Sequence, residues 1–386
     1  MTPSIGLRTG IGQVVAHMYD CLEESNSIIL EPYALSYKAR AYANDLPENT
    51  HFITVPARAL LNTWKYSNWP SLKNQLGEID LVHATNYLAP PAINNVPLLI
   101  TLHDATMVKF PELVSPKVKS LIPIIKKRLR AGAHVHVPTA AIKSDIEEHF
   151  SDDIEDASKI HIVPFGTPTI TESEPSEPIK KLVNADPYIL SIGMLEPRKN
   201  HARLIEAFEA VYEKNKHIRL FLVGPDGPAR PQIDEALSKL SHNARSRISI
   251  TGPVSDKDRS YLLKKATLLA YPSIYEGFGL PVLEAMSTKT AIVSSKEGSL
   301  EEVSGDASEF VDAYSSEDIA RGINLVLEDD KLREKLINNG EKQFLEKDPF
   351  FGGIKNKFFE GNEKGSHNNM IDRALNMDLF INNPIN

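Results

Sequence analysis

The side chains best suited to chemistry lie in the segment SIYEGFGLPVLEAMST, residues 273–288. Glu276 and Glu284 stand on either side of a Gly-Phe-Gly turn, whose glycines let a phosphate or sugar approach the backbone closely. Pro281 suits the start of a helix, and Glu284 is expected in its first turn. There its carboxylate could accept hydrogen bonds from ribose hydroxyls, while Glu276 could face a sugar or its phosphate linkage. Alternatively, Glu284 only complements the helix dipole.

A second group with suitable chemistry is the segment MLEPRKNH, residues 194–201, which follows an apolar run. Arg198 and Lys199 precede a predicted helix that Asn200 could cap. Two cations beside a helix N-terminus favour a diphosphate, because the backbone N–H groups add to their charge. The alternative interpretation is a pair of solvated surface charges.

The first half of the chain offers two weaker signals. Gly10 and Gly12 precede an amphipathic pattern, as in an anion or acceptor site over a helix N-terminus. The run LLITLHDAT ends in His103 and Asp104, where a histidine could reach a binding site. A histidine at the end of a strand is more often structural than catalytic.

Apolar runs alternate with helical patterns throughout the chain. The strands and helices that these patterns predict must position the candidate residues named above. Strands are predicted at 27–31, 51–55, 79–83, 97–103, 134–138, 159–164, 188–193, 218–224, 248–252, 267–273, 290–295 and 308–312. Helices of the second half are predicted at 201–215, 231–240, 256–265, 280–287 and 299–304, with more to about residue 347. Continuous apolar strands between amphipathic helices indicate parallel sheets that are covered on both faces.

The fold class is therefore α/β, with two doubly wound domains in 386 residues. We place the first domain at 1–166 and the second at 188–347. A hinge is predicted at 167–187, which is rich in Pro, Glu, Ser and Thr. The tail at 348–386 is Asn-rich and weakly patterned.

Composition excludes several classes of function. The net charge of −8 argues against nucleic-acid binding through a basic surface. Cys21 is the single cysteine, which excludes an internal disulfide or a cysteine-rich zinc cluster and favours a reducing cytoplasm. No run approaches the roughly 20 apolar residues of a membrane span, and the first residues lack the pattern of a signal peptide.

Two further patterns have both a structural and a functional interpretation. The Asp-x-Asp in SDKD, residues 255–258, could ligate a metal, but N-capping of a helix by Ser255 or Asp256 fits better. No essential metal is therefore expected. The basic, amphipathic stretch 117–130 could touch an anionic membrane at the cytoplasmic face, whereas packing of its apolar stripe on its own domain explains it more simply.

Together, these residues resemble family 4 of the retaining glycosyltransferases, which have the GT-B fold of two Rossmann-like domains facing across a cleft. The resemblance covers roughly residues 6–345. Its most specific part is the E-x7-E motif from Glu276 to Glu284, joined by GMLEPRKN at 193–200, VGPDG at 223–227 and TGPVSDKD at 251–258. The segments HDAT and TGIG look most like the mannosyltransferase branch.

The resemblance implies roles for individual residues. Arg198 and Lys199 would bind the donor diphosphate, Glu284 the ribose, and Glu276 the transferred sugar. His103 would contact the sugar at the reaction centre, so the implied catalytic set is His103, Arg198, Lys199 and Glu276. The implied donor-binding set is Gly12, Gly193, Arg198, Lys199, Val254, Glu276, Gly277, Phe278, Gly279, Leu280 and Glu284.

The implied reaction moves a hexose, with mannose favoured, from a nucleotide-diphosphate sugar to a glycan or lipid-linked acceptor. GDP-mannose leads UDP-sugars as the donor by family analogy alone, and no cofactor is implied. A nucleotide-sugar epimerase or hydrolase, or a non-catalytic nucleotide-sugar-binding protein, remains an alternative. The sequence departs from the family at its start, where only MTPSIGL stands in place of a first strand, and in the tail.

Overall fold

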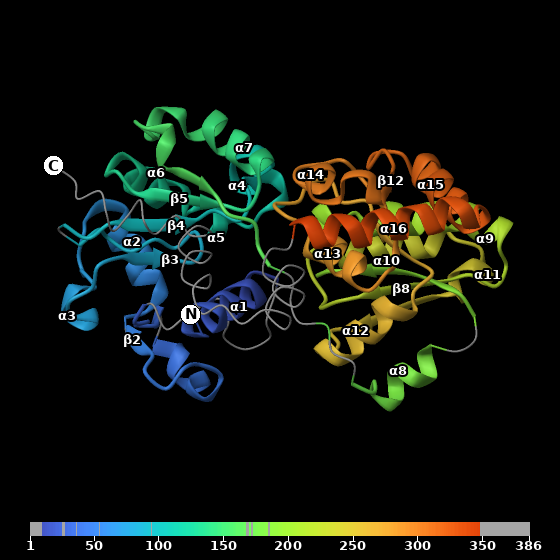
Figure 1. Ribbon diagram of the computed structural model, residues 1–386, viewed down its shortest axis with the longest axis horizontal. Coiled ribbons are helices and arrows are strands. Elements are labelled where there is room, and N and C mark those ends of the chain that lie inside the picture. The colour runs from blue at the N-terminus through green and yellow to red at the C-terminus, as the bar shows by residue number, and fades with distance from the viewer. Residues whose placement is uncertain are drawn as a thin grey trace, which may run out of the picture. The chain divides into compact units, whose positions relative to one another are not determined.

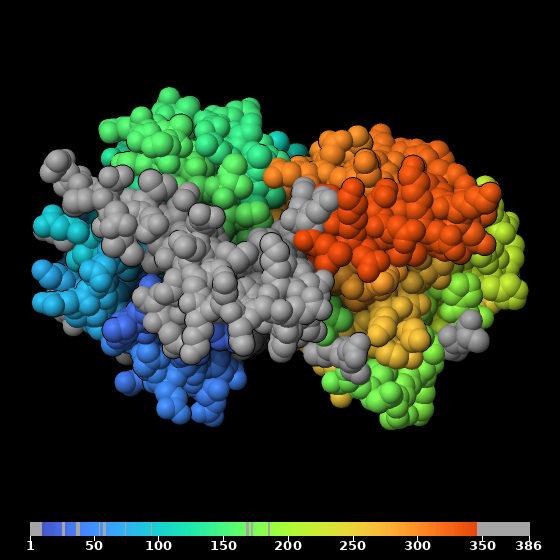
Figure 2. All heavy atoms as spheres, viewed as in Figure 1, coloured from blue at the N-terminus to red at the C-terminus, as the bar shows by residue number. Residues whose placement is uncertain are grey.

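The structure is a computed structural model of the whole chain, shown as a ribbon in Figure 1 and as spheres in Figure 2. It describes residues 10–24, 28–35, 37–53, 55–93, 95–166, 170, 173–183 and 186–347. These residues fall into two compact units, unit 1 up to Gly166 and unit 2 after it. The predicted tail at 348–386 lies outside the described residues.

Unit 2 contains a six-stranded parallel sheet in the order β12-β11-β10-β7-β8-β9. Its strands are β7 (Tyr188–Ile192), β8 (Arg219–Val223), β9 (Ile248–Gly252), β10 (Leu268–Tyr271), β11 (Ala291–Ser294) and β12 (Ser308–Phe310). Each strand lies within a predicted apolar run. The chain moves outwards from β7 to β9, returns to β10 beside β7, and continues in the other direction to β12. This is the doubly wound order that the sequence predicts.

Helices surround this sheet (Figure 1). They are α8 (Glu177–Leu182), α9 (His201–Lys214), α10 (Arg230–Lys239), α11 (His242–Arg245), α12 (Asp256–Lys265), α13 (Leu280–Ser287), α14 (Leu300–Ser304), α15 (Ser316–Glu328) and α16 (Asp330–Lys347). In the view of Figure 2, α16 forms the red part of the surface of unit 2.

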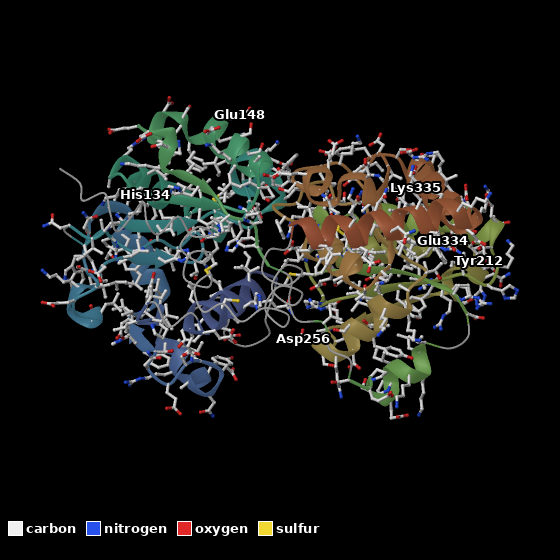
Figure 3. The ribbon with its side chains drawn as sticks, viewed as in Figure 1. His134, Glu148, Tyr212, Asp256, Glu334 and Lys335 are labelled. Atoms are coloured by element: carbon white, nitrogen blue, oxygen red, sulfur yellow. The ribbon has the colours of Figure 1, made fainter. Side chains whose placement is uncertain are left out.

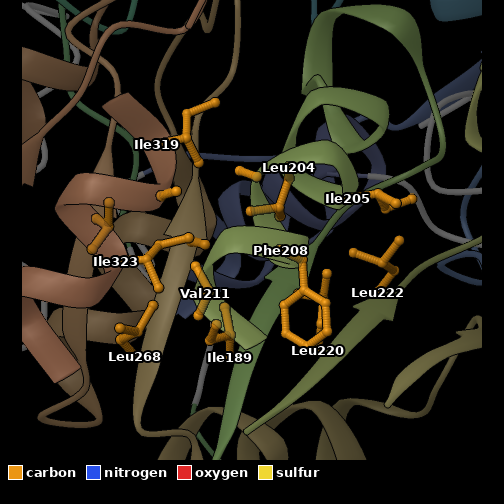
Figure 4. Packing of buried hydrophobic residues seen from close by; sticks show 14 of the residues in the cluster. Ile189, Leu204, Ile205, Phe208, Val211, Leu220, Leu222, Leu268, Ile319 and Ile323 are labelled. Atoms are coloured by element: carbon orange, nitrogen blue, oxygen red, sulfur yellow. The ribbon is translucent and has the colours of Figure 1, made fainter. Parts of the chain in front are cut away.

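The core of unit 2 follows from helical spacing. Leu204, Phe208 and Val211 recur four and three residues apart, so one face of α9 is apolar and buried. This face packs with strand residues such as Leu220 and with Ile323 of α15 (Figure 4). Because this core fixes the central strands, the loops at their carboxyl ends start from rigid positions.

Unit 1 has a four-stranded parallel sheet in the order β3-β4-β5-β6, with a separate parallel pair β1-β2. The strands are β1 (Tyr33–Leu35), β2 (His51–Ile53), β3 (Val82–Ala84), β4 (Leu98–Thr101), β5 (His134–Val137) and β6 (Ile160–Ile162). The α-helices are α1 (Gly10–Glu24), α2 (Ala57–Tyr66), α3 (Lys73–Leu76), α4 (Thr106–Lys109), α5 (Pro116–Lys119), α6 (Ile122–Arg130) and α7 (Ala140–Phe150).

The strand predicted at 27–31 is wrong. Residues 28–31 form no strand, and Ile29 is 91% exposed. The first described strand of the chain is β1, where Ala34 and Leu35 are buried against β2. An apolar run predicts a buried strand only when its side chains find a partner surface, and the side chain of Ile29 finds none.

The basic, amphipathic stretch 117–130 lies largely in two helices, α5 and α6. Ile124, Ile125 and Leu129 are buried, as expected if the apolar stripe packs within unit 1. Arg128 is buried too, and its Nη1 donates a hydrogen bond to Oδ1 of Asn68 at 3.1 Å. Among the described helices, none is long and apolar enough to cross a bilayer.

The sheet of unit 1 contains a chain of hydrogen-bonded polar side chains, of which Thr101 and His136 are buried and His83 is half-buried. Nε2 of His83 lies 2.7 Å from Oγ1 of Thr101, which lies 3.0 Å from Nδ1 of His136. Nε2 of His136 must donate to the carbonyl of Val163 at 2.9 Å, since a carbonyl can only accept. In neutral His136, Nδ1 therefore accepts from Thr101, whose oxygen accepts from His83. This network joins three strands and the segment after β6.

Candidate active site

The residues predicted to bind a diphosphate lie at the centre of the unit 2 sheet. β7 and β10 are parallel neighbours, so the segments that follow them, 193–200 and 272–279, leave the same edge of the sheet. Successive strands extend to one side from β7 and to the other side from β10. Ligands of open α/β sheets bind beyond the carboxyl ends of the strands at such a switch point.

Glu276 joins the two predicted cations. Its Oε2 lies 2.7 Å from Nη1 of Arg198, and its Oε1 lies 2.6 Å from Nζ of Lys199. The hydroxyl of Tyr271, the last residue of β10, also contacts Nζ of Lys199. Oε2 of Glu196 lies 3.0 Å from Nε of Arg198. The two cations and two carboxylates of this cluster carry no net charge together.

Burial and charge set the protonation of the cluster. Burial alone would raise the pKa of Glu276, but the adjacent Arg198 and Lys199 lower that pKa to about 2. Burial lowers the pKa of Lys199, and Glu276 opposes this effect. Burial also raises the pKa of Tyr271, so its hydroxyl keeps its proton. Glu276 is therefore ionised and Tyr271 is neutral at physiological pH.

Backbone contacts hold the loop that carries Glu276. The amide of Ile274 donates to the carbonyl of Arg198 at 2.7 Å, and the hydroxyl of Ser299 donates to the carbonyl of Gly277 at 2.7 Å. Gly298 has a φ of +65°, and a Cβ built there would lie 2.3 Å from the carbonyl oxygen of Glu276. This close approach requires glycine. The loop is fixed from both sides, which preorganises the charged cluster.

Glu284 lies on α13 with no exposed surface. Nη2 of Arg259 is 2.9 Å from its Oε1, yet neither carboxylate oxygen accepts a well-aligned hydrogen bond from a described residue. Burial raises the pKa of Glu284, and Arg259 opposes this effect. The prediction that Glu284 falls in the first turn is wrong, because α13 begins at Leu280 and places it in the second turn. Complementing the helix dipole therefore does not explain it.

The remaining predicted donor residues of unit 2 surround these groups along the chain. Gly193 directly follows β7, and a Cβ there would lie 3.2 Å from the side chain of Lys199. Gly279 is the N-cap of α13 with a φ of 92°, which a side chain rarely adopts. Val254 is half-buried between β9 and α12. The other members lie next to the cluster in sequence, with Gly277 and Phe278 buried and Leu280 half-buried.

Asn200 does not cap α9 with its side chain, contrary to the prediction. It is the N-cap residue with a φ of 61°, but its Nδ2 donates to the carbonyls of Pro272 and Ala313 at 2.9 and 2.6 Å. These carbonyls lie 72 and 113 residues away in sequence. Through these two hydrogen bonds, Asn200 links the turn that contains Arg198 and Lys199 to the segments that follow β10 and β12.

His103 lies in unit 1, two residues after β4, and is buried. Its Nε2 donates to the carbonyl of Thr85 at 2.8 Å, and its ring packs 5.3 Å from that of Phe165. Burial lowers the pKa of His103, so the ring is neutral and its Nδ1 is an acceptor. The carboxylate of Asp104 accepts instead from the amide of Thr106 at 2.9 Å.

Gly10 and Gly12 do not form a turn ahead of a helix. α1 begins at Gly10, so both glycines lie in its first turn, and Gly12 is buried. The prediction that Gly12 lies beside the donor phosphate stays a prediction.

The Asp-x-Asp within residues 255–258 lies in the first turn of α12, and Ser255 is the N-cap of that helix. Oγ of Ser255 accepts from the amide of Asp258 at 3.3 Å and donates to its Oδ2 at 2.7 Å. Asp256 lies at the start of α12 in Figure 3, with its side chain 69% exposed. Within the described residues there is no group of three or more His, Cys, Asp or Glu side chains that could hold a metal ion.

Two family models match the chain, one for each half. The model of Glycosyltransferase Family 4 matches residues 9–169, and that of Glycosyl transferases group 1 matches residues 173–343. The chain belongs to the family 4, group 1 glycosyltransferases. The resemblance that the motifs indicate is thereby confirmed.

Relatives with an assigned activity include mannosyltransferases. The chain is 39% identical to O-antigen chain mannosyltransferase B of Escherichia coli over 159 residues, which cover 40% of this chain and 41% of that protein. It thus spans about two fifths of the length of this relative. It is 23% identical to the MMP alpha-(1->4)-mannosyltransferase of Mycolicibacterium hassiacum, over 71% of this chain and 68% of that one.

The fold is also that of solved glycosyltransferases. Sucrose-phosphate synthase from Thermosynechococcus elongatus superposes with a TM-score of 0.67 at 18% identity, covering 92% of this chain and 95% of that one. At this identity the likeness concerns the fold alone. It confirms the predicted GT-B class of two α/β domains with parallel sheets.

Sequence reasoning missed two residues that contact the predicted site residues of unit 2. Tyr271 contacts Lys199, and Arg259 pairs with Glu284. Tyr271 had a signal, because it is the polar end of the otherwise apolar run LLAY before a glycine turn. Arg259 had none, since its partner lies 25 positions along the chain on another helix.

Proposed function

We propose that the protein is a retaining hexosyltransferase that moves mannose from a nucleotide-diphosphate sugar to a hydroxyl of a glycan or lipid-linked acceptor. The observation that carries this proposal is the gathering of Arg198, Lys199 and Glu276 at the switch point of the unit 2 sheet. Family membership supports a nucleotide-sugar donor. The relatives named above favour mannose, and hence GDP-mannose over a UDP-sugar.

The donor's diphosphate fits the two cations. Transfer breaks the bond between the anomeric carbon and the leaving phosphate oxygen, and negative charge develops on the diphosphate. Arg198 and Lys199 stabilise this charge from preorganised positions, assisted by the amides at the start of α13. Because these cations take the role that a metal has elsewhere, we expect transfer to persist in EDTA.

The ribose fits Glu284. Its buried carboxylate oxygens accept no well-aligned hydrogen bond from the described residues, and a buried carboxylate requires donors. Two adjacent ribose hydroxyls would supply them. This assignment gives the second glutamate of the E-x7-E motif a role that its ion pair with Arg259 alone does not explain.

The transferred sugar would be held by Glu276, the amides of residues 277–279 and His103. Neutral His103 offers Nδ1 as an acceptor for a sugar hydroxyl, because its Nε2 is committed to Thr85. We assign Glu276 to the hydroxyls of the sugar, and we assign no side chain of the described residues as a nucleophile. We therefore propose attack by the acceptor on the face that the phosphate leaves. The acceptor's proton passes to the leaving phosphate, and the anomeric configuration is retained.

The test is to incubate the protein with GDP-mannose or UDP-glucose and mannose-containing oligosaccharides, with and without EDTA. The proposal predicts a product longer by one hexose, with the donor's α configuration by NMR. A donor converted to its epimer or only hydrolysed would favour the epimerase or hydrolase alternative. Donor binding without turnover would favour the non-catalytic one.

A further inference from the structure

Glu276 holds both cations that a donor diphosphate would need. Its two carboxylate oxygens lie 2.7 and 2.6 Å from Arg198 and Lys199, and Glu196 holds Arg198 from a third direction. The cluster is neutral as a whole. A diphosphate therefore meets no net positive charge here unless a carboxylate moves away.

We infer that Glu276 makes the site discriminate between the intact nucleotide sugar and its nucleoside diphosphate product. The diphosphate takes over Arg198 and Lys199 from Glu276, and the released carboxylate turns to the sugar. This inference rests on the proposed function and adds a specificity-determining role to Glu276.

The exchange follows from how the cations are held. Lys199 has only 10% of its side chain exposed, and Tyr271 contacts its Nζ from the end of β10. Tyr271 therefore keeps Lys199 in place while its ionic partner changes from carboxylate to phosphate. Arg198 stays attached to the loop through the carbonyl of Tyr275, 3.3 Å from its Nη1. The cations need not move, so the carboxylate must.

A displaced Glu276 needs new hydrogen-bond donors. Its side chain is 6% exposed, and a buried carboxylate without a partner is strongly unfavourable. The hydroxyls of the donor's sugar can donate to it, whereas a nucleoside diphosphate alone has no sugar at that position. When the nucleoside diphosphate binds alone, the carboxylate of Glu276 either has no partner or shares Arg198 and Lys199 with the diphosphate. Either arrangement weakens binding of the nucleoside diphosphate relative to the nucleotide sugar.

Product release follows from the same exchange. After transfer, the sugar departs with the acceptor, and Glu276 loses the hydroxyls that paired with it. The carboxylate of Glu276 then competes with the diphosphate for Arg198 and Lys199, and this competition speeds dissociation of the nucleoside diphosphate. Because product release is the slowest step of many enzymes, this competition would raise turnover.

The test measures binding of inorganic pyrophosphate, GDP and GDP-mannose by calorimetry at pH 7.5. Glu276→Gln keeps the shape of the side chain and removes the competing charge. We expect it to bind pyrophosphate and GDP about tenfold more tightly than the unchanged protein, while GDP-mannose gains less. Glu235→Gln is the matched control, because Glu235 forms an exposed ion pair with Lys239 at 2.7 Å. It should leave all three affinities unchanged within about twofold.

Equal or weaker pyrophosphate binding by Glu276→Gln would overturn the inference. If that variant does not fold, Glu276→Asp tests the same point, since the shorter side chain cannot hold both cations and should also tighten binding. The proposed function fails separately, if the unchanged protein binds neither GDP-mannose nor UDP-glucose.

Discussion

Two polar clusters, one in each unit, are built in opposite ways. In the cluster of unit 1 the polar groups between the strands are neutral, with His83, Thr101 and His136 joined by hydrogen bonds. In the cluster of unit 2 the polar groups are ionised, and Glu276 lies between Arg198 and Lys199. The neutral network spans adjacent strands, whereas the charged cluster lies beyond the strand ends on loops.

The difference separates stability from function. A neutral hydrogen-bond network satisfies every member and fixes strand positions, so its loss should be felt as lost stability. A buried charge cluster contributes little net stability, because the cost of desolvation offsets the attraction. In the proposed function, the cluster supplies a preorganised electrostatic field for a diphosphate whose charge increases during transfer. Changes in unit 1 should therefore alter unfolding, and changes in the unit 2 cluster should alter transfer.

Acidification should expose the contrast most strongly. Burial lowers the pKa of His83 to about 3 and that of His136 to about 4, whereas the pKa of a histidine in the unfolded chain is about 6.5. Their contribution is therefore complete above pH 6.5 and is lost as the pH falls towards 4, by about 3 kcal/mol for His136 alone. Glu276 has a folded pKa of about 2 and loses its contribution only below its ordinary value of 4.5.

Unit 1 should thus unfold first between pH 6.5 and 4. Trp64 and Trp69, the two tryptophans of the chain, both lie in unit 1, so their fluorescence reports that unit. Hydrogen exchange of β7 and β8 peptides reports unit 2. Unit 2 also buries one histidine with a low pKa, His201, at about 3. Acid therefore destabilises unit 2 as well, but less than unit 1, which has both His83 and His136. Loss of protection in β7 before the fluorescence changes would contradict the comparison.

Lys199→Ala should lower the rate of sugar transfer by roughly 100-fold or more, because a preorganised charged donor is lost. The midpoint of unfolding should change little, since Arg198 still holds Glu276. Initial rates with GDP-mannose check this. Lys239→Ala on the exposed face of α10 should leave the rate unchanged, and an unchanged rate for Lys199→Ala would refute the assignment.

Thr101→Val should lower the stability of unit 1 and leave the rate of sugar transfer by the remaining folded protein unchanged. It leaves the donor of half-buried His83 and the acceptor of buried His136 without the hydroxyl of Thr101, which should cost about 2 kcal/mol of unfolding free energy. Urea unfolding followed by tryptophan fluorescence measures this. Thr63→Val is the control, because that hydroxyl contacts only carbonyls of its own helix. A loss no larger than in the control would show that the network is not stabilising.

Glu284→Gln should have the smallest of these effects. It keeps a contact to Arg259 but weakens the acceptor for ribose, so donor affinity should fall about tenfold, as for a lost charge-assisted hydrogen bond. Stability should fall only a little, because Gln keeps an acceptor for Arg259, which also lies 3.8 Å from the carboxylate of Asp256. Donor affinity measured by calorimetry and thermal unfolding together check both parts. A destabilised variant with unchanged affinity would assign Glu284 to the fold alone.

The sequence predicts the strands of unit 2 closely, because continuous apolar runs between helical patterns have one good interpretation. It fails at Ile29, whose exposure depends on tertiary packing, and at Asn200, whose partners lie far along the chain. The motifs predict functional roles for Arg198, Lys199 and Glu276. They do not predict that these three contact one another, since 77 residues separate Lys199 from Glu276 and only the strand order brings them together.

The most direct test of the central claim is a crystal structure with bound GDP. The account predicts the diphosphate within hydrogen-bond distance of Arg198 and Lys199, the ribose hydroxyls on Glu284, and the carboxylate of Glu276 turned away from at least one cation. A nucleotide bound elsewhere on unit 2, or on unit 1, would contradict it.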